Sequence, residues 1–220
     1  MARVVVYGTG QVASVVHTYL TEDSPHEVVA FTVGARHVTS DTFLDLSVVP
    51  FEHVARLYPP TEFAMIIAIG FQQVNRLRAE KYAEAKASGY ELITYIHSKA
   101  TVWKDLVIGD NCVVMEDTVI QPFAVVGNDV ILGPGSCVGH HSIVKDHCLL
   151  ASHVDVSGNV IVEPYCFLGA NSTIRDGVTV AEECVVGANV AIHQDTVSRG
   201  VYVGPRPELL GLPSNKLPRI

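Results

Sequence analysis

Aliphatic residues recur at every sixth position along the second half of the chain, without a break over sixteen repeats. Counting in hexads from residue 101, the second position is always Val, Ile or Leu. These residues are Val102, Ile108, Val114, Ile120, Val126, Leu132, Val138, Val144, Leu150, Val156, Val162, Leu168, Ile174, Val180, Val186 and Ile192. No helix has a period of six, and a simple strand has a period of two. The repeat is typical of a parallel β-helix with one short strand per hexad, in which stacked turns share one core.

The sixth position of the hexads is small or short, as a tightly packed coil requires. The residues there are Cys112, Thr118, Ala124, Val130, Ser136, Ser142, Cys148, Val154, Val160, Cys166, Ser172, Val178, Cys184 and Val190. Four of the five cysteines therefore share this position, and Cys137 occupies the first position of its hexad. We interpret them as buried apolar residues rather than disulfides. No C-x-x-C pair occurs, so the sequence predicts no cysteine metal site.

The first 96 residues follow a different pattern, in which β-branched runs alternate with helical ones. Strands are predicted at 3–7, 27–33, 62–69 and 90–96, and helices at 11–20 and 71–88, with Gly89 ending the second helix. This alternation predicts parallel strands joined by crossovers. We therefore expect a Rossmann-like α/β domain over 1–96, a β-helix over 97–203 and a proline-rich tail over 204–220.

Charge and hydropathy narrow the class of protein. The net charge of −8 argues against a nucleic-acid-binding surface. No apolar run approaches the ~18 residues of a membrane span. The N-terminal apolar run ends at Gly8, which is too short for a signal peptide. These features predict a cytoplasmic protein that binds neither nucleic acid nor membrane.

A glycine turn follows the first predicted strand. Gly8, Thr9, Gly10 and Gln11 form it, and such a turn lets backbone amides at a helix N-terminus approach a phosphate. A dinucleotide site also needs an acidic residue near the end of the second strand, whereas residues 31–36 contain none. The pattern favours a phosphate-bearing ligand other than NAD, and the alternative is a tight turn without a ligand. Arg36 and His37 are candidates for phosphate contact or simply solvated loop residues.

Histidines are concentrated at the corners of the predicted coil. Three hexads complete one turn, so residues eighteen apart stack at about 4.8 Å. His140 and His141 lie at one corner, and Gly158 stacks on His140. A histidine is a suitable base near neutral pH, and a backbone N–H can hold an oxyanion, so the pair suits acyl transfer. The alternative is that these histidines face solvent or a neighbouring subunit, which is the interpretation we prefer for His147. For His153, structural and functional roles are both open.

Nearly the whole chain resembles the bacterial nucleotide-sugar acetyltransferases of the sialic-acid O-acetyltransferase and UDP-4-amino-sugar N-acetyltransferase group. The resemblance rests on the Gly8-Thr9-Gly10 turn, on Ala68-Ile69-Gly70 before an Asn75-Arg76 helix, and on Gly139-His140-His141 followed by Gly158-Asn159-Val160. It implies a left-handed β-helix and a homotrimer that uses acetyl-CoA and a nucleotide-linked sugar.

The resemblance also implies roles for particular residues. His140 corresponds to the general base of the family, and Gly158 to its oxyanion amide. Acetyl-CoA would contact Leu149, Gly158, Ala170 and Ala188 in a groove between subunits, and the nucleotide sugar would bind Gly8, Thr9, Gly10 and Gln11. His141 occupies the position where family members often carry an acid. Either His141 shares the proton relay, or Asp155 or Asp176 replaces that acid.

The leading hypothesis is therefore an acetyl-CoA-dependent N-acetyltransferase for a nucleotide-linked amino-deoxy sugar, with direct attack on the thioester and no metal. Sugar O-acetylation, or transfer of another acyl group, is the alternative on the same fold. A different class is a zinc-dependent hydratase using His140, His141, His147 and His153 from adjacent subunits. The last alternative is a non-catalytic scaffold that binds a sugar nucleotide.

Overall fold

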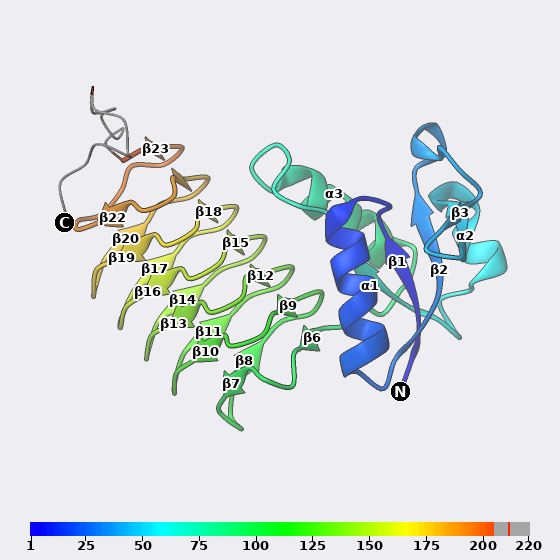
Figure 1. Cartoon of the computed structure of the whole chain (residues 1–220), viewed down its shortest axis with the longest axis horizontal. Coiled ribbons are helices and arrows are strands. Elements are labelled where there is room, and N and C mark those ends of the chain that lie inside the picture. The colour runs from blue at the N-terminus through cyan, green and yellow to red at the C-terminus, as the bar shows by residue number, and fades with distance from the viewer. Residues whose placement is uncertain (205–210, 212–220) are drawn as a thin grey trace.

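The computed structural model describes residues 1–204 and residue 211. An α/β domain stands at one end of a long coil of stacked turns (Figure 1). The predicted tail over 204–220 lies outside the described residues apart from residues 204 and 211. Across the described parts of the chain, no helix is long and apolar enough to cross a membrane.

The α/β domain is built on a five-stranded sheet. Its strands are β1 (Arg3–Tyr7), β2 (Glu27–Val33), β3 (Thr42–Phe43), β4 (Leu46–Pro50) and β5 (Ala64–Ile67). The order is β3-β4-β2-β1-β5, and only the short edge strand β3 runs antiparallel. The four parallel strands follow the order of half a doubly wound sheet.

Three helices cover this sheet: α1 (Gln11–Asp23), α2 (Phe51–Leu57) and α3 (Arg76–Ala87), with a 3-10 turn η1 at Ala35–His37. Alternate residues of β1 face opposite sides of the sheet. Val4 and Val6 share a core with α1, whereas Val5 and Tyr7 pack with buried residues of α2 and α3. The sheet is therefore buried on both faces.

Several predicted elements of this domain have different bounds in the structure. Strands 3–7 and 27–33 form as predicted, but α1 continues to Asp23 and α3 begins only at Arg76. The late start of α3 has a backbone cause, because Gln73, Val74 and Asn75 all have positive φ. Strand β4 and helix α2 were not predicted from the sequence.

The predicted strand at 90–96 is divided between two sheets. Leu92 forms an isolated bridge with Met65 beside the α/β sheet. Residues Tyr95–Ile96 form β6, which pairs with β9 in the coil. The chain therefore enters the coil before residue 97.

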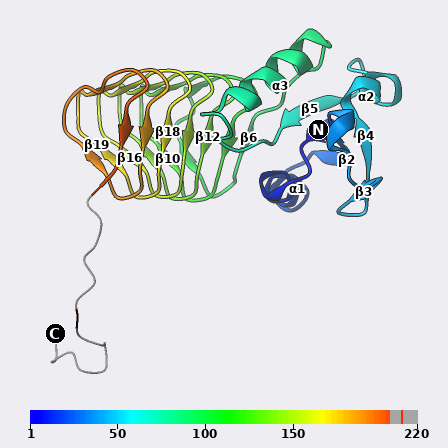
Figure 2. The same ribbon diagram turned by 90° about the horizontal axis from the view of Figure 1, so that it is seen from above.

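The coil consists of two-residue strands that recur every six residues as far as residue 192, followed by one more strand. They are β7 (Thr101–Val102), β8 (Val107–Ile108), β9 (Val113–Val114), β10 (Val119–Ile120), β11 (Val125–Val126), β12 (Ile131–Leu132), β13 (Cys137–Val138), β14 (Ile143–Val144), β15 (Leu149–Leu150), β16 (Asp155–Val156), β17 (Ile161–Val162), β18 (Phe167–Leu168), β19 (Thr173–Ile174), β20 (Thr179–Val180), β21 (Val185–Val186), β22 (Ala191–Ile192) and β23 (Val201–Tyr202). Every third strand pairs in parallel, which gives three sheets along the coil. The short, stacked strands fit a left-handed β-helix, which Figure 2 shows from above.

The three sheets of the coil need names, because they face different surroundings. We call the sheet β6-β9-β12-β15-β18-β21-β23 the domain sheet, because Val113 and Ile131 on it join the core of the α/β domain. The sheet β8-β11-β14-β17-β20 is the aliphatic sheet, and β7-β10-β13-β16-β19-β22 is the polar sheet. Strand β23 extends the domain sheet beyond the last regular hexad.

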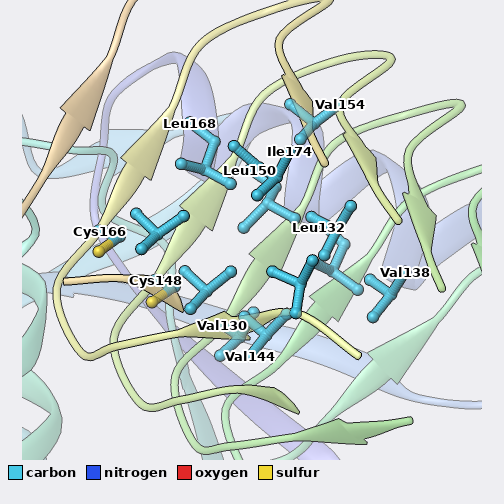
Figure 3. Packing of buried hydrophobic residues seen from close by; sticks show 14 of the residues in the cluster. Val130, Leu132, Val138, Val144, Cys148, Leu150, Val154, Cys166, Leu168 and Ile174 are labelled. Atoms are coloured by element: carbon cyan, nitrogen blue, oxygen red, sulfur yellow. The ribbon is translucent and has the colours of Figure 1, made fainter. Parts of the chain in front are cut away.

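The core of the coil confirms that the second and sixth positions of the hexads are buried. Second-position residues such as Leu132, Val138 and Leu150, and sixth-position residues such as Cys148 and Cys166, are fully buried. They point into one column inside the coil (Figure 3). Four of the cysteines are buried and all five are free.

The α/β domain is joined to the coil by a buried ion pair. Arg78 of α3 and Asp129 of the coil are both fully buried, and Arg78 Nε lies 3.0 Å from Asp129 Oδ1. The guanidinium also donates to the backbone carbonyls of His147 and Cys148. Asp129 accepts from Asn111 Nδ2 at 2.7 Å. One helix residue thus holds two successive turns of the coil in register with the α/β domain.

Candidate active site

A cavity of about 920 Å³ opens at the carboxyl edge of the α/β sheet. All four residues of the predicted glycine turn, Gly8, Thr9, Gly10 and Gln11, line it. The segment after β2 and the segment after β5 complete the walls. In open α/β sheets, ligands bind in this crevice outside the carboxyl ends of the strands.

The glycine turn has a steric reason for its composition. Gly8 has a φ of +131°, and an added Cβ would lie 2.8 Å from the Ala68 carbonyl oxygen. Gly10 caps α1 without any side-chain hydrogen bond. The first amides of α1 therefore face the cavity with no side chain occupying them, as an anion site requires.

Charged and polar side chains gather at the cavity beside β2. Glu52 of α2 accepts the Ala35 N–H at 3.0 and 3.2 Å, and Lys81 of α3 contacts Glu84 at 2.8 Å. Arg36, which the sequence left open between phosphate contact and a solvated loop position, lines the cavity and donates from Nε to His37 Nε2 at 3.0 Å.

The pKa values of two residues that line this cavity are shifted. Burial raises the pKa of Tyr7, partly opposed by the charge of Lys81. The pKa of Glu52 is lowered, first by a hydrogen bond from its own backbone amide and then by that of Ala35. The cavity therefore presents an ionised carboxylate and an ammonium group to a ligand.

The second candidate centre lies on the coil, at the corner between the polar and aliphatic sheets. His140 and His141 occupy the turn between β13 and β14, and Gly158 occupies the turn one coil further on. Asn159 N donates to His140 O at 2.9 Å, which locks the two turns together. The stacking predicted from the spacing of eighteen residues is therefore present.

The His140 ring lies directly against Gly158. A Cβ added to Gly158 would be 2.7 Å from His140 Nε2 and 2.8 Å from Asp176 Oδ2. Only glycine leaves this space open. His140 Nδ1 lies 3.2 Å from His141 Nδ1, so the second histidine contacts the ring nitrogen that points away from Gly158. Of the two acids considered from the sequence, Asp176 shares this column, whereas Asp155 lies on β16.

The histidine side of this corner is accessible to a reactant. The side chains of His140 and His141 are exposed, while the Gly158 backbone is buried beneath them. Within the described part of the chain, the Gly158 N–H donates no hydrogen bond. An imidazole and a backbone N–H with no acceptor among the described residues thus lie side by side.

The predicted acetyl-CoA contacts are spread over different edges of one chain. Ala170 and Ala188 occupy turns between the domain sheet and the polar sheet, and Gly158 occupies a different corner. Leu149 packs, partly buried, against the core of the α/β domain. A single subunit does not bring these four residues together.

The other coil histidines are also separated. His147 lies in the turn between β14 and β15, and its Nδ1 contacts Asp129 Oδ2 at 2.8 Å. His153 lies at the third corner, between β15 and β16, and crowds Gly135. One chain therefore cannot bring His140, His141, His147 and His153 to a single ion. Among the described residues, no group of three or more potential metal ligands was found.

Sequence reasoning missed three titratable residues of the cavity: Tyr7, Glu52 and Lys81. Tyr7 ends β1 just before the glycine turn, so its position was a usable signal. Glu52 and Lys81 come from helices whose placement depends on the tertiary structure, and the sequence pattern gave no sign of their approach.

Comparisons with known proteins agree with this arrangement. The GMPPB C-terminal domain family matches residues 108–211, and no curated protein matches the sequence. A mutant of perosamine N-acetyltransferase from Caulobacter crescentus, solved with CoA and GDP-perosamine, is 25% identical with a TM-score of 0.84. The match covers 93% of this chain and 94% of that one.

Two other solved structures share the fold. The acetyltransferase domain of PglB from Neisseria gonorrhoeae FA1090 is 24% identical, with a TM-score of 0.75 over 89% of this chain and 93% of its own. WeeI from Acinetobacter baumannii AYE is 16% identical, with a TM-score of 0.78 over 93% and 97%. These two matches show the shared fold. The first match, at 25% identity, confirms the resemblance predicted from the sequence, which is to bacterial nucleotide-sugar acetyltransferases of the left-handed β-helix type.

Proposed function

We propose that the protein transfers an acetyl group from acetyl-CoA to the amino group of a nucleotide-linked deoxy sugar. The observation that carries this proposal is the contact of His140 Nε2 with Gly158, next to an amide that donates no hydrogen bond among the described residues. The similar perosamine N-acetyltransferase, solved with CoA and GDP-perosamine, supports the choice of substrates.

In the proposed reaction the sugar amine attacks the thioester carbonyl directly. A new C–N bond forms, the carbonyl oxygen becomes an oxyanion, and the Gly158 N–H donates to it. His140 Nε2 takes the proton that the amine loses. When the intermediate collapses, the C–S bond breaks and the imidazolium returns the proton to the CoA thiolate. General-base assistance contributes about 10²–10⁴-fold, and one oxyanion donor about 10²–10³-fold.

The environment of His140 determines which nitrogen does this work. Because Nδ1 lies against His141 Nδ1 at 3.2 Å, Nε2 is the atom available beside Gly158. His141 orients the ring, and Asp176, which faces the same column, stabilises the imidazolium by its charge. Both are positioning residues in this proposal, and together they replace the acid that other family members carry next to the base.

The nucleotide part of the acceptor would bind the cavity of the Rossmann-like domain. Its diphosphate would lie at the glycine turn Gly8–Gln11, at the N-terminus of α1, and would accept from the backbone amides that follow Gly8. The Gly8 N–H itself already donates to Thr32 O. This cavity belongs to the domain that packs on the domain sheet, while His140 lies at the opposite corner of the triangular coil. The amine therefore reaches the base of a neighbouring subunit, and the complete site needs a homotrimer.

The aliphatic sheet offers the surface for that assembly. Its outward residues Val107, Val125, Ile143 and Ile161 form an apolar column along the coil, which runs beside the His140 corner. In the trimer, Gly158 of one subunit and Ala170 and Ala188 of the next would line the acetyl-CoA groove. The contact between acetyl-CoA and Leu149 remains a prediction from the sequence. The cytoplasmic location of the protein is also still a prediction.

The direct test is CoA release from acetyl-CoA with UDP-, dTDP- and GDP-linked amino sugars, using neutral sugars as controls. Release with amino sugars alone is the expected result. Release with a hydroxyl acceptor alone would replace N-acetylation by O-acetylation. Absence of release in a protein that does not bind acetyl-CoA would refute the transferase proposal, and metal analysis would then test the hydratase alternative.

A further inference from the structure

The end of β2 carries no acidic residue in the sequence, yet the structure places a carboxylate there. Glu52, from the first turn of α2, reaches the segment after β2 and accepts the Ala35 N–H with both oxygens, at 3.2 and 3.0 Å. Its Oε1 lies 3.8 Å from the position of an added Gly34 Cβ. Helix α2 therefore supplies the group that strand β2 lacks.

The carboxylate of Glu52 lies where an acid could bind the ribose of a nucleotide. In dinucleotide-binding sheets, an acid at the end of the second strand accepts hydrogen bonds from ribose hydroxyls. Glu52 lines the same cavity as the glycine turn. The two regions are adjacent, because Gly8 N donates to Thr32 O at 2.8 Å and neighbouring strands lie about 4.8 Å apart. A ligand with its diphosphate at the turn thus brings its ribose beside Glu52.

Glu52 also has free acceptor sites for the hydroxyl groups of a ribose. A carboxylate offers about four acceptor sites, and the shared Ala35 N–H occupies only part of them. The side chain is exposed to the cavity, and its lowered pKa keeps it ionised. A negative charge here would repel a 2′-phosphate, which argues against an NADP-type ligand.

We propose that Glu52 recognises the cis-diol of a ribonucleoside diphosphate, so that the acceptor is a ribonucleotide-linked sugar rather than a 2′-deoxyribonucleotide-linked one. This inference rests on the proposed function of the cavity as the nucleotide-sugar site. It adds a selectivity for the sugar of the nucleotide, which the glycine turn cannot supply because that turn contacts only phosphate.

The test is direct binding of matched nucleotides to the full chain, measured by calorimetry. GDP is compared with 2′-deoxy-GDP, and UDP with 2′-deoxy-UDP. A hydrogen bond to a charged group corresponds to about ten- to hundredfold in affinity, so the wild type should favour the ribose form by at least about tenfold. Glu52→Gln keeps an oxygen for the Ala35 N–H and should reduce this preference to less than about threefold. Glu62→Gln, an exposed acid outside the cavity, should keep it.

Each other outcome overturns the inference in a distinguishable way. If the wild type binds ribose and deoxyribose forms within threefold, the nucleotide proposal survives but Glu52 does not contact the diol. If Glu52→Gln keeps the wild-type preference, another group recognises the ribose. If none of the four nucleotides binds, this inference and the proposed nucleotide role of the cavity fail together.

Discussion

The buried contact between Arg78 and Asp129 allows a quantitative test of how the α/β domain is fixed to the coil. Both residues are fully buried, with Nε 3.0 Å from Oδ1. Asp129→Asn keeps the volume, and the amide oxygen can still accept from Arg78 and Asn111. Its amide nitrogen would face His147 Nδ1, now 2.8 Å from Oδ2, and the imidazole can accept there in its other tautomer. The substitution therefore removes charge with little loss of hydrogen bonding.

The expected cost follows from the uncompensated guanidinium. Removing one partner of a buried pair destabilises a protein by about 3–5 kcal/mol. For a chain of this length, each kcal/mol lowers Tm by about 2–4 °C, which predicts a decrease of about 6–20 °C. Lys145→Met is the matched control, because Lys145 and Glu163 pair at 2.8 Å with side chains 43% and 28% exposed. Losing that exposed pair should cost less than about 1 kcal/mol.

The assay is urea unfolding followed by circular dichroism at one fixed protein concentration, since assembly would make stability depend on concentration. Substituting both partners, as in Arg78→Met with Asp129→Leu, should recover part of the loss, because no unpaired charge then remains. A loss below about 1 kcal/mol in Asp129→Asn would refute the reasoning and would mean that water or local opening solvates Arg78.

Three further predictions concern the coil and its assembly, and a fourth concerns the contact between α1 and Ser98. His140→Ala should reduce turnover by ~10²-fold or more without changing the oligomeric mass, and a decrease under threefold would place the base elsewhere. Gly158→Ala adds a Cβ 2.6 Å from the His140 ring, so turnover should fall by about 10²-fold while CoA binding is measured separately; normal turnover would contradict this packing. Ile143→Lys on the aliphatic sheet should convert the proposed trimer to monomer in light scattering and abolish turnover, whereas an active monomer would contradict the proposed shared site. Hydrogen bonds from Ser98 hold the pKa of Asp23 at about 2, below its usual 3.8. The stability they confer is complete above pH 3.8 and is lost as the pH falls through 2, so the stability of Asp23→Asn should change less than that of the wild type across this window in acid titrations of Tm.

The sequence by itself determined the coil, because its physics is local and repeated. An aliphatic second position and a short sixth position in every hexad leave only one periodic arrangement that buries all of them. The stacking of His140 on Gly158 followed from the same repeat, because three hexads complete one turn and residues eighteen apart stack. The hydrogen bond from Asn159 N to His140 O confirms this stacking. The glycine turn was also predictable from the sequence. The positive φ of Gly8 is a conformation that strongly favours glycine over other residues.

Only the tertiary structure decided the rest, because it depends on contacts between residues far apart in sequence. Strand 90–96 appeared continuous by hydropathy, but β6 pairs with β9 because the coil competes for its backbone hydrogen bonds. Helix α3 starts late, since Asn75 adopts a left-handed conformation and donates to Cys166 O at 3.0 Å. Glu52 reaches the end of β2 only through the packing of α2. No periodicity encodes such an approach between segments, so the carboxylate missing from the sequence pattern was visible only in the folded chain.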